Sequence, residues 1–144
     1  MRARRTVRIG VASAVIAIGA VCAGCVSAPP GPTGPASLSV IPSPTVNFPN
    51  SSQASHFPMP QIQVTVTNTG GHTATNVVVH GVNEYSVPSS TCSTLAPGQS
   101  CTAMVQFCPG AQGQYTYPLI VTGRDASTNA PLSVSTIVTG TATA

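Results

Sequence analysis

Three cysteines lie close together in the middle of the chain, at Cys92, Cys101 and Cys108. Thiols can ligate a soft metal, carry redox chemistry or form a disulfide. The gaps of eight and six residues between them differ from the short Cys-x2–4-Cys spacing of structural zinc sites. After residue 25 there is no Cys-x-x-Cys pair and no cation beside a cysteine to stabilise a thiolate. A zinc site or a thiol redox centre is therefore disfavoured.

A disulfide between Cys92 and Cys101 is the prediction that the intervening residues favour. They include "LAPGQ" (95–99), and a Pro-Gly turn there can bring the two sulfur atoms within bonding distance. Closing a loop of this size would stabilise the fold by about 2.5–3 kcal/mol. Cys108 is left over, and we predict a free thiol, with an intermolecular disulfide as the alternative.

Copper is a softer metal than zinc and is the other metal to consider, because thioether and imidazole side chains are also present. The residues concerned are Met59, Met104, His56, His72, His80 and Cys108. Two of the histidines lie in stretches typical of turns or loops, and Met104 is more simply explained by packing. We therefore predict no resident metal and no cofactor.

Ionisable side chains are scarce. Four of the five arginines are within the first eight residues, there is no lysine, and the other charged residues are Glu84, Arg124 and Asp125. Nucleic-acid binding needs clustered cations, and hydrolysis by paired carboxylates needs two neighbouring acids. We therefore predict no nucleic-acid partner, no catalytic residues and no enzyme activity. Arg124 and Asp125 are expected at a solvated hairpin tip.

The N-terminus has the pattern of an export signal. A basic stretch, "MRARRTVR", precedes an apolar run from Ile9 to Val21, which is the length of a signal-peptide core. "CAGC" follows and resembles a bacterial lipobox. The resemblance implies cleavage after residue 24, acylation of Cys25 by palmitate-type chains, and a lipid-anchored place in the cell envelope. An ordinary secretory signal and an uncleaved anchor are the alternatives.

The next segment is predicted to be a tether. Residues 25–37 contain "SAPPGPTGPAS", with four prolines and two glycines, which excludes a helix or a central strand. An extended tether of this kind would span about 30 Å. Val26 does not match the Asp that often retains lipoproteins at the inner membrane, which weakly favours the outer membrane in a didermal cell.

Residues 38–144 are predicted to form one all-β domain. Alternating apolar and polar residues, as in "IQVTVTN" (62–68), are typical of half-buried strands, and turn residues separate them. We expect seven strands in an antiparallel sandwich, with the tyrosines at 115 and 117 packed inward. The expected strands are 38–48, 62–68, 77–82, 84–87, 101–107, 114–123 and 131–142, the first of them irregular and at an edge.

Four sequence elements resemble the Hydin-type or choice-of-anchor-D immunoglobulin-like domain. They are "VTVTNTG", "TCSTLAPGQSC", "VQFCPG" and a closing "VTGTA". The resemblance implies an immunoglobulin-like sandwich, a recurrent disulfide at Cys92 and Cys101, and a role in binding or spacing rather than catalysis.

The function predicted from the sequence is a non-enzymatic envelope lipoprotein. Its domain would be structural or would bind another envelope protein or a surface ligand. One alternative is a carbohydrate-binding or adhesive module, although the chain has no tryptophan. A periplasmic copper or thiol carrier is a more distant alternative.

Overall fold

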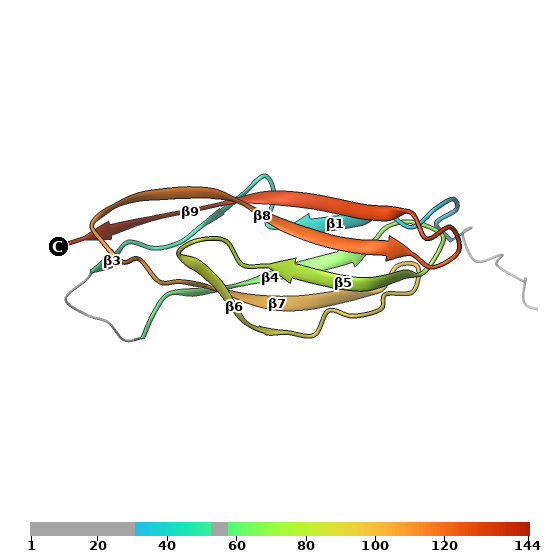
Figure 1. Ribbon diagram of the computed structural model, residues 1–144, viewed down its shortest axis with the longest axis horizontal. Helices are drawn as coiled ribbons and strands as arrows, with labels where there is room; N and C mark the ends of the chain where they lie inside the picture. Colours follow the sequence, from blue (N-terminus) through green and yellow to red (C-terminus); the bar gives the residue numbers. More distant parts are fainter. Residues whose placement is uncertain (1–30, 53–57) are drawn as a thin grey trace, which may run out of the picture.

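The computed structural model describes residues 31–52 and 58–144. The predicted signal peptide (1–24), Cys25 and His56 lie outside these residues. Nine strands make up the regular structure of these described residues (Figure 1): β1 (Leu38–Ile41), β2 (Thr45–Asn47), β3 (Ser51–Ser52), β4 (Gln61–Asn68), β5 (Ala74–His80), β6 (Tyr85–Ser90), β7 (Ser100–Phe107), β8 (Gly113–Asp125) and β9 (Pro131–Thr143). No helix within the described ranges is long and apolar enough to cross a membrane.

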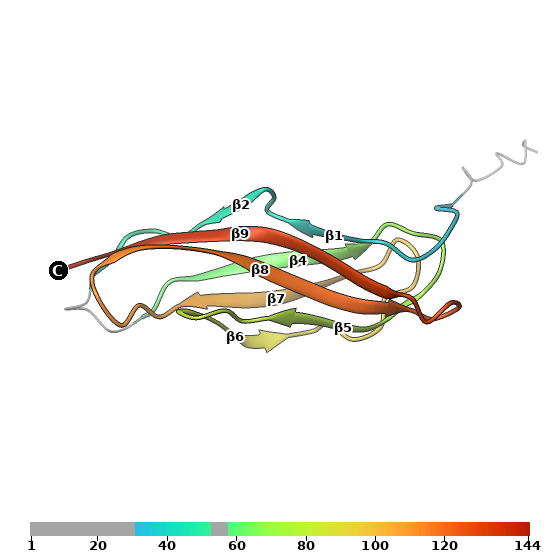
Figure 2. The same ribbon diagram turned by 45° about the horizontal axis from the view of Figure 1, so that its top comes forward.

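The strands form two sheets that pack face to face (Figures 1 and 2). One sheet, which we call sheet A, has the order β1-β4-β7-β6, and the other, sheet B, has the order β2-β9-β8-β5 with β3 also paired to β9. The hairpin of β8 and β9 is the longest feature, with 13 residues in each strand. The prediction of an all-β sandwich is confirmed.

The predicted first strand, 38–48, is divided into β1 and β2, and the short β3 follows beyond it, so the described residues contain two strands that the sequence did not reveal. β1 pairs antiparallel with β4 in sheet A, whereas β2 and β3 pair parallel with β9 in sheet B. Pro42 and Pro44 lie at the crossover, where neither can donate a ladder hydrogen bond. The buried Thr136 hydroxyl bonds to the carbonyl oxygens of Pro42 (2.9 Å) and Pro44 (3.0 Å), which fixes the crossing segment against β9.

The core lies between the sheets and follows the predicted alternation. Val64 and Val66 of β4 are fully buried, while Gln61 and Gln63 face solvent. Burying a side chain of this size contributes about 1.5–3 kcal/mol. Sheet B contributes the other side of the core, including Leu119, Val121 and Val138. The alternation of apolar and polar residues along the strands therefore determines which face of each sheet packs in the core.

Aromatic rings fill one end of the sandwich. Tyr85 stacks on Phe107 with ring centroids 4.9 Å apart, and Phe48 lies 5.2 Å from Tyr85. The rings of Tyr115 and Tyr117 pack edge-on against this pair, as their predicted inward position requires. The five rings, Phe48, Tyr85, Phe107, Tyr115 and Tyr117, are the aromatic end of the domain.

Candidate functional site

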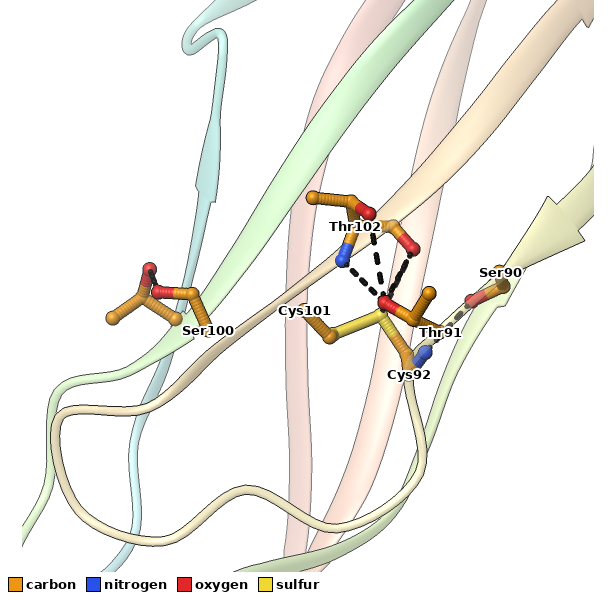
Figure 3. The surroundings of a disulfide bond; sticks show 7 residues. Ser90, Thr91, Cys92, Ser100, Cys101 and Thr102 are labelled. Atoms are coloured by element: carbon orange, nitrogen blue, oxygen red, sulfur yellow. Dashed lines mark hydrogen bonds between the residues drawn. A yellow bond between two sulfur atoms is a disulfide. The ribbon is translucent and has the colours of Figure 1, made fainter.

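The predicted disulfide is present in the structure. Cys92 and Cys101 are joined with Cα atoms 5.0 Å apart, and the chain between them forms a loop (Figure 3) that turns at Pro97 and Gly98. The turn is closed by a hydrogen bond from the Gln99 amide to the Ala96 carbonyl, 3.0 Å long, and Gly98 has a φ of 77°. Glycine suits that conformation because it has no Cβ to clash. The Pro-Gly turn, together with the family resemblance, therefore indicated the right pair of cysteines.

The disulfide loop covers an exposed edge of sheet B. The backbone of Leu95 exchanges two hydrogen bonds with Ala74 at the start of β5, of 2.8 and 2.9 Å, and the Ser93 carbonyl accepts from Val77. The Leu95 side chain is buried. Because an open strand edge invites pairing with other chains, the loop protects the first half of β5 from such pairing. The disulfide thus holds a loop that joins the two sheets.

Cys108 follows the far end of β7 and takes no part in this bridge. Its half-buried Sγ lies 3.1 Å from Sδ of Met59 and 3.9 Å from the Ser86 hydroxyl. It forms no disulfide with any described residue. The free thiol of the native protein stays a prediction.

The two histidines that the structure describes, His72 and His80, do not contact Cys108. His72 contacts Asp125, and Nε2 of His80 lies 2.8 Å from the Thr122 hydroxyl on the outer face of sheet B. In residues 31–52 and 58–144, no group of three or more His, Cys, Asp or Glu side chains could hold a metal ion. Of the possible copper ligands, Met59 and Cys108 therefore lie together, whereas His72 and His80 lie elsewhere in the described residues.

Asp125 was expected to be solvated, and this expectation is wrong. Its side chain is 1% exposed, and its carboxylate accepts hydrogen bonds from the backbone amides of Ala36 (2.7 Å), Ser127 (2.8 Å) and Thr128 (3.0 Å). His72 Nδ1 lies 3.0 Å from the same group. Arg124 remains exposed, as predicted, because adjacent strand residues point to opposite faces.

These contacts hold Asp125 in its charged form. The Ala36 amide makes the largest contribution to lowering the pKa of the carboxyl well below its ordinary value of 3.8. Burial acts in the opposite direction, and the other two amides and His72 lower the pKa further. Asp125 is therefore a structural anion whose lone pairs are occupied, which leaves it unsuited to act as a general base.

Asp125 fixes the end of the predicted tether to the domain. Residues 34–37 run along the end of the sandwich, where Ala36 is buried and Ser37 exchanges hydrogen bonds with the Asn68–Thr69 turn. A Cβ at Gly70 would overlap the Pro35 carbonyl oxygen, so glycine is needed for the chain to approach this closely. The packing of the chain against the sandwich thus extends to residues before Leu38, as far as Gly34.

Asn68 completes this end and was not recognised from the sequence. Its side-chain nitrogen donates to the carbonyls of His72 (2.8 Å) and Leu95 (2.9 Å), and its oxygen accepts from Ser37 and Gly70. A buried amide with all its bonds formed acts as a rigid connector. The available signal was an asparagine directly before a Thr-Gly-Gly turn. We call Asn68, Asp125, the Cys92–Cys101 bridge and residues 34–37 the anchored end.

Glu84 lies at the aromatic end. Its Oε2 is buried and has no hydrogen-bond partner within the described residues. Burial, together with the nearby charge of Glu84, raises the pKa of Tyr85 to about 12, and the Tyr85 hydroxyl donates to the Tyr115 carbonyl. No second acid lies in the described chain to pair with Glu84, since Asp125 is in the anchored end.

Comparison with known proteins gives the family. The family model CARDB matches residues 38–130, which is more than half of the chain. The chain belongs to the CARDB family. CARDB domains are bacterial and immunoglobulin-like, and such folds are generally non-enzymatic. The predicted fold class is thereby confirmed. No curated protein matches the chain significantly.

Solved structures share the fold of this CARDB domain at low sequence identity. PapD-like domain 7 of human CEP192 matches with a TM-score of 0.54 and 11% identity, covering 94% of this chain and 97% of that one. A Porphyromonas gingivalis protein of unknown function matches with a TM-score of 0.54 and 18% identity, covering 73% of this chain and 47% of that one. The Vibrio cholerae VesB protease matches with a TM-score of 0.51 and 21% identity, covering 72% of this chain and 31% of the protease. The chain thus spans less than half of the last two proteins.

Proposed function

We propose that the protein is a lipid-anchored lipoprotein of the bacterial cell envelope. Cleavage after residue 24 would leave Cys25 as the acylated first residue, and residues 25–33 would connect the lipid to the domain. Two or more acyl chains hold a protein on a membrane essentially permanently. The sandwich itself is a structural or protein-binding module without catalysis. Its finer resemblance to Hydin-type or choice-of-anchor-D domains remains part of this proposal.

The docking of residues 34–37 is the observation that supports the proposal most strongly. A tether that merely leads away from a domain needs no fixed attachment, yet here the Ala36 amide is bound by a buried carboxylate at 2.7 Å. The attachment means that a pull on the lipid end is borne by the anchored end of the sandwich. Asp125 is one of only two acidic residues in the sequence, and it is used to hold this segment. This use supports a mechanical rather than a catalytic role for the domain.

The outer face of sheet B is the surface to which a protein partner would bind. Of the four large apolar side chains that are exposed among the described residues, three lie there, on neighbouring strands: Val78 (46%), Ile120 (41%) and Ile137 (37%). The outer face of the central β4 strand in sheet A carries glutamines and threonines instead. Apolar side chains at the centre of a face are typical of protein interfaces.

The test is acylation in the native host with labelled palmitate. The wild-type chain is expected to take up label and sediment with membranes, whereas Cys25→Ser should take up none and leave the membrane fraction. Cys22→Ser is the matched control and should behave like the wild type. Label that persists in Cys25→Ser would refute the anchor, and so would an unlabelled wild-type chain.

A further inference from the structure

The outer face of sheet B contains a hollow beside the turn that joins β8 to β9. Its volume is about 350 Å3, within the range of small-ligand sites. It is lined by Asn76, Thr122, Gly123, Arg124, Pro131, Leu132 and Ser133. The hollow is open to solvent, so it would admit the end of a ligand.

A β-bulge creates one wall of the hollow. The register of β5 against β8 shifts between Thr75 and Val78, and Asn76 takes a φ of 51°. A bulge bends its strand and redirects a side chain, and such features are common beside binding sites. The Asn76 side chain makes no hydrogen bond within the described residues. Its amide group is therefore available both to donate and to accept.

Arg124 gives the hollow its charge. It is the single cationic Lys or Arg side chain after residue 8. Its Nη1 bonds to the Asn129 carbonyl at 3.2 Å, and no carboxylate pairs with it among the described residues. The neighbouring Asp125 points to the opposite side and is fully bonded. The guanidinium therefore has several unused donors, and a carboxylate is the group that they fit best.

The hollow continues into the apolar face. Ile120, Thr122 and Arg124 alternate along the same side of β8, so Ile120 lies about 13 Å from Arg124 at roughly 3.3 Å per residue. Val78 is paired with Thr122, and Ile137 with Pro118. A ligand would meet a cation first and aliphatic side chains a few residues farther along.

We infer that this surface binds the C-terminal end of a protein partner, with its terminal carboxylate on Arg124 and preceding aliphatic residues over Ile120 and Val78. The hydroxyl of Ser133 and the amide of Asn76 would meet the backbone of the last residue, which presents both a donor and acceptors. An acidic sugar fits less well, because sugars favour exposed aromatic rings and all three tyrosines of the described chain pack inward or are half-buried. The inference deepens the proposed binding role of this face.

The probe is acetyl-Leu-Leu-Ala with a free carboxylate, compared with the same peptide capped as an amide. Binding to the full chain in detergent micelles would be followed by ligand-observed NMR titration. The free acid should bind at least about tenfold more tightly than the amide, since the charge-assisted bonds are lost on capping. Arg124→Gln should remove this preference, and Arg124→Lys should keep part of it.

Control variants distinguish a loss of peptide binding from a loss of folding. Gln63→Ala, on the opposite sheet, should leave binding unchanged, while Ile120→Ser should weaken the binding of both peptides. An unchanged melting temperature would show that Arg124→Gln is folded, as an exposed substitution should be. Equal binding of acid and amide, or binding of neither, overturns the inference.

Two further ligands test the source of the carboxylate. Tighter binding of acetyl-Leu-Glu-amide would assign the hollow to an acidic side chain, and tighter binding of glucuronate would assign it to an acidic sugar. Either result overturns the inference. All of these outcomes leave the labelling of Cys25 unaffected, so a failure here is distinct from a failure of the proposed anchor.

Discussion

The two ends of the sandwich are stabilised by different kinds of interaction. The anchored end depends on a disulfide, on a buried carboxylate bound by three backbone amides and His72, and on a buried amide whose partners are all backbone groups. The aromatic end depends on ring packing, with Tyr85 stacked on Phe107. Directional bonds fix a chain segment at a defined place, which is what the attachment of residues 34–37 requires. Ring packing supplies stability without fixing any particular segment.

The largest effect is expected at the aromatic end. Phe107→Ala should lower the free energy of unfolding by about 3–5 kcal/mol, because it removes a fully buried ring from the centre of the cluster. Urea unfolding of the full chain measures this. Ile41→Ala, at a side chain that is 59% exposed, is the matched control and should change stability by less than about 0.5 kcal/mol. Similar losses from both variants would contradict the assignment of this core.

Loss of the disulfide should rank second. The double variant Cys92→Ala/Cys101→Ala should lower the free energy of unfolding by about 2.5–3 kcal/mol, since the unfolded chain regains the entropy of an open loop. Hydrogen exchange at the Leu95 and Ala74 amides should also quicken, because the loop then leaves β5 more readily. Unchanged exchange there would mean that the loop is held without the bridge.

Gly140 offers a finer test of the aromatic end. A Cβ at this position would lie 2.9 Å from Cε1 of Phe107, which is closer than packing allows. Gly140→Ala should therefore cost about 1–3 kcal/mol through overpacking. In the double variant with Phe107→Leu the two costs should not add, as a double-mutant cycle would show. Additive costs would mean that the two residues are not in contact.

The smallest expected effect is on the pH dependence of the melting temperature, and it tests the role of Asp125 in the anchored end. The pKa of Asp125 is lowered in the fold, so the contribution of Asp125 to stability is complete above its ordinary pKa of 3.8 and is lost as the pH falls below that value. The melting temperature of the wild type should therefore fall more steeply from pH 5 to pH 2 than that of Asp125→Asn. Gly70→Ala should flatten the curve in the same way, because it displaces the segment that carries the Ala36 amide. Parallel curves for all three chains would refute the role of Asp125.

The contrast between the ends also shows what the sequence could reveal. Alternation placed Val64, Val66 and Val105 in the core, and the Pro-Gly turn placed the disulfide, because these signals are local. The pairing of Ala36 with Asp125 joins residues 89 positions apart, and nothing near either residue indicates the other. The change of sheet at Pro42 and Pro44 depends likewise on Thr136, which is distant in the sequence. Long-range polar contacts were thus the part that could not be predicted.

The intact mass of the native protein would show in one measurement whether the module is both lipid-anchored and closed by the disulfide. The protein would be extracted from membranes and alkylated without reduction. We expect a chain that begins at Cys25, carries acyl groups and has one alkylated thiol, at Cys108. An unlipidated chain with three alkylated thiols would contradict both the anchor and the bridge.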